Sequence, residues 1–206
     1  MAPGMISSAV EVVCMNQQIL TVCNQAVVLL ERFCHDQNAQ LERLAKRIAA
    51  EFTEGGQLLI AANGCLQSVA QLMASQFAYR LSFERPALPA ICLGNDPLLV
   101  GRMNADGREA QILTRHYRAL SSERHIVLLL NDGSDPAPLA ALRDDALDNG
   151  QQVALITFDP AKDPLVGSDI ELCLDLGTAS VPRMLEVAQF AGHLLCELVE
   201  CELFRS

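Results

Sequence analysis

Five short apolar segments alternate with segments of helical periodicity, and this alternation restricts the folds that the chain can adopt. The expected strands cover residues 57–62, 87–93, 125–130, 152–158 and 170–176. Short, continuously apolar strands between helices are typical of a parallel sheet that is covered on both faces. The pattern therefore predicts an α/β fold, a three-layer α/β/α sandwich around a mostly parallel five-stranded sheet.

Residues 1–54 are expected to form an N-terminal helical pair that shares one domain with the remaining residues, 55–206. Apolar positions recur at helical spacing through this segment, and the polar Asp36-Gln-Asn divides it into helices over 6–34 and 38–52. We expect this pair and the last helix to pack between subunits, because a monomer would leave their apolar faces in water. The main helices predicted after the pair cover residues 67–81, 108–120, 136–149 and 181–204.

The charge balance excludes several classes of partner. The 206 residues include 25 Asp and Glu against 15 Lys and Arg, which gives a formal net charge of −10. A surface this acidic repels phosphate backbones, so we expect no direct binding to nucleic acid. Charged and polar residues interrupt the apolar runs too often for a membrane span, and residues 1–10 show no secretory signal. We therefore expect a cytoplasmic protein without membrane contact.

The eight cysteines do not have the pattern of a disulfide or metal framework. None forms a Cys-x-x-Cys pair, several lie in apolar runs, and no secretory signal accompanies them. We expect small buried thiols, which is how free cysteine usually packs.

Two loops that follow predicted strands carry short polar residues. Their candidate ligand-binding residues are Asn63, Gly64 and Ser68 in the first loop and Asn131, Gly133 and Ser134 in the second. In open parallel sheets, ligands bind at the carboxyl ends of the strands, where backbone N–H groups at a helix N-terminus can hold an anion. Neither loop has the sequence of a P-loop or of a dinucleotide fingerprint. An anion site and a plain strand–helix turn remain the two alternatives for each loop.

Two longer segments match a known pattern. One is Arg80-Leu-Ser-Phe-Glu-Arg-Pro-Ala-Leu-Pro-Ala-Ile-Cys-Leu-Gly-Asn-Asp96, and the other is Arg183-Met-Leu-Glu-Val-Ala-Gln-Phe-Ala-Gly-His193. In this order they resemble the SIS (sugar isomerase) domain, specifically the phosphoheptose isomerase family. The resemblance implies the SIS fold, a homotetramer, and a sugar-phosphate ligand held by the two loops. Members of the family isomerise sedoheptulose 7-phosphate, often at a site that contains zinc, and the resemblance implies this activity as an expectation.

The chain departs from the family pattern at the positions that would carry this chemistry. The family's phosphate-gripping serine in the first loop aligns with Leu66, and Asp132 and Asp135 bring negative charge into the second loop. On the helix after the first loop, the metal histidine and the catalytic carboxylate of the family align with Leu72 and Gln76. The resemblance therefore implies weak sugar-phosphate binding at best.

On the last helix, His193 keeps its place in the family motif, with Glu186 as the other remnant of the acid–base apparatus. One histidine does not make a zinc site, which needs three or four ligands. We therefore expect no metal and no cofactor, and no catalytic residue is assigned. A packed or interface histidine is the alternative for His193.

The final segment, Cys196-Glu-Leu-Val-Glu-Cys-Glu-Leu-Phe204, is similar to the tail of the DnaA initiator-associating group of this family. That group is non-enzymatic and gathers the replication initiator DnaA, and the resemblance implies that Leu203 and Phe204 contact DnaA. The alternative is that this apolar pair closes the last helix onto the core.

The resemblance, together with the lost catalytic groups, thus implies a non-catalytic homotetrameric scaffold in replication initiation. Two other hypotheses compete with it. One is a phosphoheptose or other sugar-phosphate isomerase that uses Glu186 or a loop aspartate as base and His193 as acid. The other is a sensor that binds a sugar phosphate without turnover.

Overall fold

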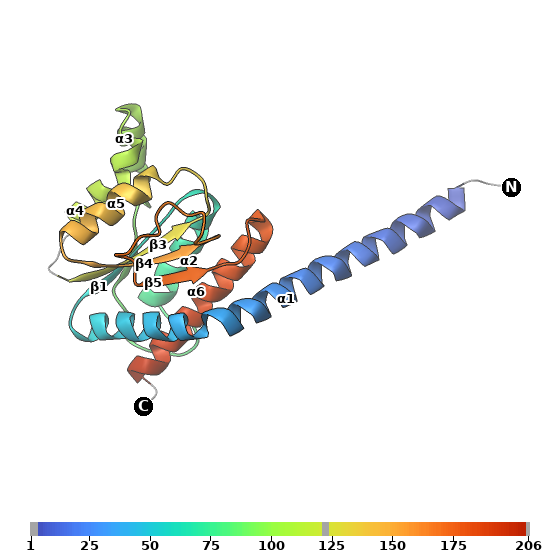
Figure 1. Cartoon of the computed structure of the whole chain (residues 1–206), viewed down its shortest axis with the longest axis horizontal. Helices are drawn as coiled ribbons and strands as arrows, with labels where there is room; N and C mark the ends of the chain where they lie inside the picture. Colours follow the sequence, from blue (N-terminus) through green and yellow to red (C-terminus); the bar gives the residue numbers. More distant parts are fainter. Residues whose placement is uncertain (1–3, 121–123, 205–206) are drawn as a thin grey trace.

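A five-stranded sheet forms the centre of the computed structural model, which describes residues 4–120 and 124–204 (Figure 1). The strand order is β2-β1-β3-β4-β5, and every neighbouring pair is parallel. This confirms the predicted parallel sheet. The strands are β1 (Gln57–Ala62), β2 (Ala90–Cys92), β3 (His125–Asn131), β4 (Gln152–Thr157) and β5 (Leu172–Asp175).

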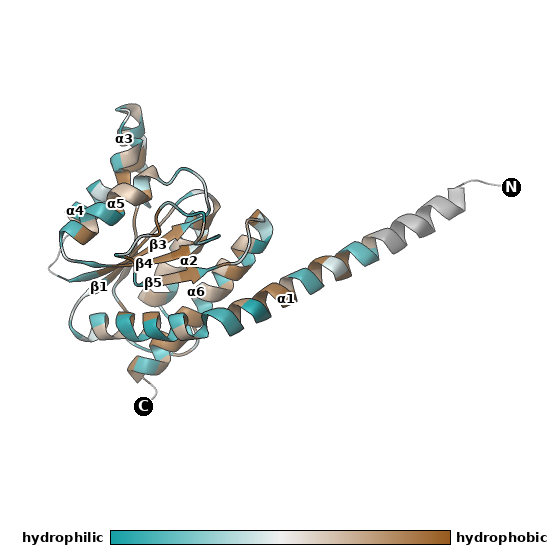
Figure 2. Cartoon of the chain, viewed as in Figure 1, coloured by the Kyte–Doolittle hydropathy of each residue, from teal (hydrophilic) through white to brown (hydrophobic). Residues whose placement is uncertain are grey.

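Helices cover both faces of the sheet. Successive strand residues point to opposite sides, and because both sides are apolar, each needs a helical layer to bury it. On one face, Leu58 and Ile60 of β1 belong to a core shared with α1, α2 and α6. On the other face, Leu59 and Ala61 pack in a core with α4 and α5. Figure 2 shows the resulting band of apolar strands between the helical layers. The helices are α1 (Gly4–Thr53), α2 (Gln67–Ala78), α3 (Pro97–Ala105), α4 (Ile112–Ala119), α5 (Ala137–Asp148) and α6 (Val181–Phe204).

The N-terminal segment is one helix, and the predicted helical pair is wrong. Helix α1 continues through the polar residues that were interpreted as a break, and none of these is glycine or proline. Asp36 pairs with Arg32 one turn earlier, at 3.6 Å. The side-chain oxygen of Gln37 accepts a hydrogen bond from the backbone N–H of Asp175 at 3.3 Å. The polar residues therefore attach the helix to the end of β5 instead of interrupting it.

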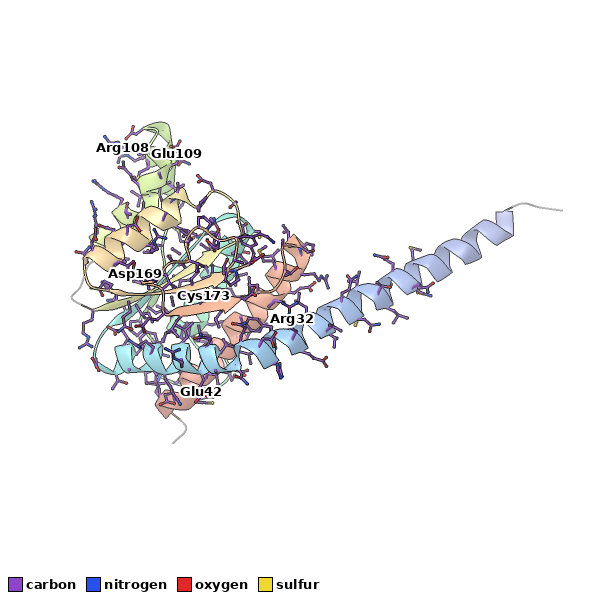
Figure 3. The ribbon with its side chains drawn as sticks, viewed as in Figure 1. Arg32, Glu42, Arg108, Glu109, Asp169 and Cys173 are labelled. Carbon is purple, nitrogen blue, oxygen red and sulfur yellow. The ribbon has the colours of Figure 1, made fainter. Side chains whose placement is uncertain are left out.

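Helix α1 has two parts with different surroundings. From Phe33 onward it contributes buried side chains to the core, among them Leu44 and Ile48. The residues before Phe33 project from the body as an arm (Figures 1 and 3). The body still contacts the near end of this arm, because Leu29 and Leu30 pack against the core and the Val22 carbonyl accepts a hydrogen bond from Arg183 at 3.1 Å. The arm carries the exposed apolar residues Met15, Ile19, Leu20, Val27 and Val28. Within residues 4–120 and 124–204, no helix is long and apolar enough to cross a membrane.

Several elements are shorter than predicted, among them α2, β4 and β5, each by one to three residues. The strand expected over 87–93 is reduced to β2, and the helix expected over 108–120 begins with a 3₁₀ turn over Glu109–Gln111 before α4. Helix α1 ends at Thr53, one residue beyond the predicted end. Gly55 ends it, because its φ of 83° is a left-handed conformation that glycine adopts readily.

A buried ion pair joins α6 to the loop that follows α2. The Arg85 Nε lies 2.8 Å from Glu200 Oε1, and both side chains are 1% exposed. The same guanidinium donates to the carbonyl oxygens of Phe77, Gln76 and Pro86. Glu200 also accepts from the backbone N–H of Leu81. The pair therefore fixes the path of the chain between α2 and β2.

The cysteines whose side chains are described are all free, and Cys14 lies outside these residues. Cys92 and Cys196 are buried as predicted, whereas Cys23 is exposed on the arm. Burial raises the pKa of Cys92 to about 11 and that of Cys196 to about 12. Both buried thiols are therefore protonated and unreactive at neutral pH.

Candidate functional site

The two predicted loops lie side by side at the carboxyl edge of the sheet. One follows β1 and enters α2 through a 3₁₀ turn over Gly64–Leu66, and the other follows β3 and enters α5. Strands β1 and β3 are neighbours, with Ala62 opposite Leu130. The strand order also reverses direction here, which is the place where open α/β sheets bind ligands.

Side-chain hydrogen bonds join the two loops. The Asn63 amide nitrogen donates to Asn131 Oδ1 at 2.8 Å and to the Asp135 carbonyl at 3.2 Å. In return, Asn63 Oδ1 accepts from the backbone N–H of Asp132 at 2.9 Å. Asn131 Oδ1 also accepts from the Gly133 N–H at 3.1 Å. The two asparagines thus hold the loops in one fixed arrangement.

The Asp132 carboxylate lies over the first loop and binds its backbone. Its Oδ2 accepts from the Cys65 N–H at 2.7 Å, and its Oδ1 accepts from the Ser134 N–H at 3.0 Å. A Cβ atom at Gly64 would overlap Oδ2, so the missing side chain of this glycine makes the approach possible. Burial alone would raise the pKa of Asp132, but hydrogen bonds from Ser134 and Cys65 outweigh it and lower this pKa. The carboxylate is therefore ionised at neutral pH.

Two buried polar atoms next to these loops have no hydrogen-bond partner among the described residues. They are Nδ2 of Asn131 and Oγ1 of Thr157. The two residues are opposite each other at the ends of β3 and β4, and both side chains are buried. A buried polar atom without a partner costs free energy, and these two atoms lie at the edge where parallel sheets bind ligands.

The structure brings together most of the predicted loop residues and uses them in different ways. Asn63 and Asn131 connect the loops through side chains, and Ser134 contributes its backbone N–H. Gly133, at φ 86°, leaves room for the ring of Phe158. The Ser68 hydroxyl donates back to the Cys65 carbonyl at 3.2 Å. Binding of a sugar phosphate by these residues stays a prediction.

The remnant acid–base residues on α6 are engaged within that helix. The Glu186 carboxylate pairs with Arg183 at 2.7 Å, and His193 Nε2 lies 2.6 Å from the Gln189 amide nitrogen. On α2, Leu72 is exposed, and the buried Gln76 Oε1 has no partner among the described residues.

The part of the chain that the structure describes contains no group of three or more His, Cys, Asp or Glu residues placed to hold a metal ion. That the chain takes no zinc stays a prediction.

The predicted partner-contact pair ends α6. Leu203 is half-buried and packs against the core, while Phe204 remains 39% exposed. The Phe204 ring stacks edge-to-face on Phe83, with ring centroids 6.2 Å apart. One member of the pair thus closes the helix onto the body, and the other is accessible.

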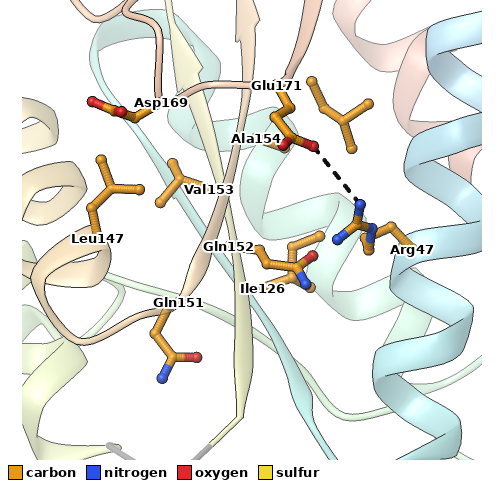
Figure 4. Close-up of a pocket in the computed structure, with 10 residues that line it drawn as sticks. Arg47, Ile126, Leu147, Gln151, Gln152, Val153, Ala154, Asp169 and Glu171 are labelled. Carbon is orange, nitrogen blue, oxygen red and sulfur yellow. Dashed lines mark ion pairs between the residues drawn. The ribbon is translucent and has the colours of Figure 1, made fainter.

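A cavity of about 180 Å³ lies at the opposite edge of the sheet, where β3, β4 and β5 begin. Figure 4 shows Arg47 of α1 beside Glu171, 3.9 Å apart, with Asp169 and Gln151 also lining the space. Because ligands of parallel sheets bind at the carboxyl ends of strands, we assign the site to the two loops and not to this cavity.

Comparison with known proteins gives the family. No family model matches the chain. It is 30% identical over 181 residues to the phosphoheptose isomerase of Desulfovibrio desulfuricans, which covers 86% of this chain and 84% of that protein. The chain belongs to the phosphoheptose isomerase family. A second family member, from Solidesulfovibrio magneticus, is 30% identical over 190 residues and covers 91% of both chains.

The fold agrees with solved structures of the phosphoheptose isomerase family. The phosphoheptose isomerase of Francisella tularensis superposes with a TM-score of 0.81 at 21% sequence identity, covering 90% of this chain and 97% of that one. The enzyme of Neisseria gonorrhoeae gives a TM-score of 0.77 at 15% identity, covering 90% and 98%. The SIS fold implied by the resemblance is therefore confirmed.

Sequence reasoning missed the part that Asp132 plays in the site. It placed this residue in the second loop as a charge that repels phosphate, but did not foresee a contact with the first loop. The available signal was local: Asp132-Gly-Ser134 is a typical turn in which an aspartate accepts from the N–H two residues on. The contact with Cys65, 67 residues away, depends on the strand register.

Proposed function

We propose that this chain is a non-catalytic member of the phosphoheptose isomerase family that acts as a homotetrameric scaffold. The observation that carries the proposal is the engagement of both remnant acid–base groups on α6, Glu186 with Arg183 and His193 with Gln189. Isomerisation requires a base that reaches the substrate C–H proton to be moved and an acid that reaches the carbonyl oxygen. At the family's positions on α2, Leu72 and Gln76 supply neither group.

Turnover of a sugar phosphate is the competing function, and the names of the relatives favour it. In that case a loop aspartate would have to act as the base. Asp132 is poorly suited, because hydrogen bonds from two backbone N–H groups stabilise its charged form. A carboxylate whose pKa is held low is a weak proton acceptor.

A thermal-shift titration with sedoheptulose 7-phosphate, with product scored in the same samples, separates the hypotheses. The enzyme of Desulfovibrio desulfuricans is the positive control. We expect neither a shift nor product with this chain. Product formation would reject the proposal, and a shift without product would favour a sugar-phosphate sensor. A ligand of the folded state raises stability by RT ln(1 + [L]/Kd), so even weak binding is detectable at high concentration.

The arm of α1 supports the proposed assembly. A monomer would leave its apolar residues, including Ile19 and Val28, in water. Light scattering should give about four times the chain mass of 22.4 kDa. Val28→Asp should shift the mass toward smaller species, while Gln25→Asp, an exposed polar position on the same arm, should not. A monomeric wild type would contradict the assembly.

We further propose DnaA as the partner, on the resemblance of the tail and the accessibility of Phe204. Phe204→Ala should reduce DnaA retention in a pull-down by at least about tenfold, the effect expected for an aromatic anchor at an interface. Tyr79→Ala removes another exposed aromatic ring and serves as the control. Equal retention by both variants, or no retention by the wild type, would reject this partner or its contact.

A further inference from the structure

Asp132 has the position and the contacts of a bound anion. Its two oxygens accept from the Cys65 N–H of one loop and the Ser134 N–H of the other, at 2.7 and 3.0 Å. Backbone N–H groups that converge from two loops can hold a small oxyanion. Here a side chain of the protein itself takes that place.

The residues around the Asp132 carboxylate leave space and a hydrogen-bond donor that an ordinary turn does not require. Gly64 leaves open the space that Asp132 Oδ2 fills, and any Cβ there would overlap it. The buried Asn131 Nδ2, a hydrogen-bond donor, has no partner among the described residues although its Oδ1 accepts twice. One buried donor beside the Asp132 backbone is therefore unused by the described residues.

We propose that Asp132 is an internal ligand: its carboxylate occupies an oxyanion site built by the loops after β1 and β3 and makes that site reject phosphorylated ligands. The inference rests on the proposed function, because a site filled in this way does not hold the phosphate of a substrate. If the Asp132 carboxylate is removed by mutation, the emptied site should bind a small oxyanion such as formate or phosphate.

Tethering gives the carboxylate a lasting advantage over a free anion. A group joined to its site by a short segment competes at an effective concentration on the order of millimolar or higher. A free phosphate would also have to approach two carboxylates, because Asp135 lies in the same loop and caps the Ala137 N–H. Both the tethered carboxylate and the charge repulsion oppose phosphate in the wild type. Shortening Asp132 removes the tethered competitor completely, whereas the repulsion by Asp135 remains.

Chemical rescue by anions tests the proposal. Asp132→Ser can still accept from the Ser134 N–H in a turn, but it is too short to reach Cys65. Asp132→Ala removes both contacts. At constant ionic strength, formate or inorganic phosphate should raise the Tm of these variants by about 2–4 °C and leave the wild type unchanged. Asp135→Ala removes the neighbouring carboxylate and should behave like the wild type.

A folded Asp132→Ser variant that formate and phosphate stabilise no more than Asp135→Ala would overturn the proposal. If neither Asp132 variant folds, the wild type decides: the amide signals of Cys65 and Ser134 should move together in an NMR acid titration as one carboxyl is protonated. A Cys65 amide that does not titrate with Ser134 would equally overturn it. Turnover by the wild type would reject the proposed function, whereas anion rescue without turnover leaves both proposals standing.

Discussion

Replacing Arg85 with methionine should destabilise the protein by about 3–5 kcal/mol, the usual cost of removing one partner from a buried ion pair. The cost follows from the burial of Glu200, whose side chain is 1% exposed and would keep as donors the backbone N–H of Leu81 and the weakly donating thiol of Cys196, 4.0 Å away. The change also removes the donors that the carbonyl oxygens of Phe77 and Gln76 now use. Since domains of this kind have about 5–15 kcal/mol of stability, the variant should unfold at a much lower urea concentration.

Equilibrium urea unfolding at one protein concentration provides the measurement, and Arg80→Met provides the control. Arg80 pairs with Glu84 on the surface, where 39% of the Arg80 side chain and 81% of the Glu84 side chain are exposed, so the loss of this pair should cost about 1 kcal/mol or less. Combining Arg85→Met with Glu200→Leu should recover most of the loss, because the buried charge is gone. Similar costs for Arg85→Met and Arg80→Met would refute the reasoning.

Three further outcomes can be measured directly. During alkylation at pH 8, followed by mass spectrometry of peptides, Cys196 should stay unmodified in the native protein and react once the protein is unfolded in urea, because in the fold it is buried and its pKa is raised to about 12; equal labelling of Cys196 in both states would contradict this. Burial lowers the pKa of His125, so protonation favours the unfolded state, and the free energy of unfolding should fall below about pH 6.5 by at most about 1.4 kcal/mol per pH unit. His125→Gln should lack this component, and an unchanged pH slope would count against it. Gly64→Ala should lower stability by more than about 1 kcal/mol in thermal unfolding, because φ is 49° and the Cβ overlaps a carboxylate. The control Gly101→Ala, in an open helix position, should raise stability by about 0.5–1 kcal/mol; a loss in both glycine variants would speak against the steric explanation.

The layered fold could be predicted because its cause is local. Runs such as Leu58–Ala61 are apolar at every position, which only a strand buried on both faces requires. The continuity of α1 could not be predicted in the same way. Its polar segment remains helical partly because Gln37 binds the backbone of Asp175, 138 residues away, and periodicity carries no information about that contact.

The candidate site shows the same division. Its location followed from the rule that ligands bind beyond the carboxyl ends of parallel strands, and the loops with Asn63 and Asn131 do meet there. The contact of Asp132 with Cys65 depends on the register between β1 and β3. The Arg85–Glu200 pair likewise joins positions 115 residues apart. Both of these pairings become visible only when the tertiary structure is known.

The unbroken α1 imposes a rule on how the length of the chain can change. Each residue of an α-helix adds 1.5 Å and about 100° of rotation, so one residue inserted near Leu20 would turn the apolar face of the preceding residues by about 100° relative to the sheet. An insertion of seven residues, close to two turns, would nearly restore the direction of that face and move it outward by about 10 Å. Because α1 is held to the body from Val22 onward, insertions and deletions before that point should be tolerated only in steps close to whole turns.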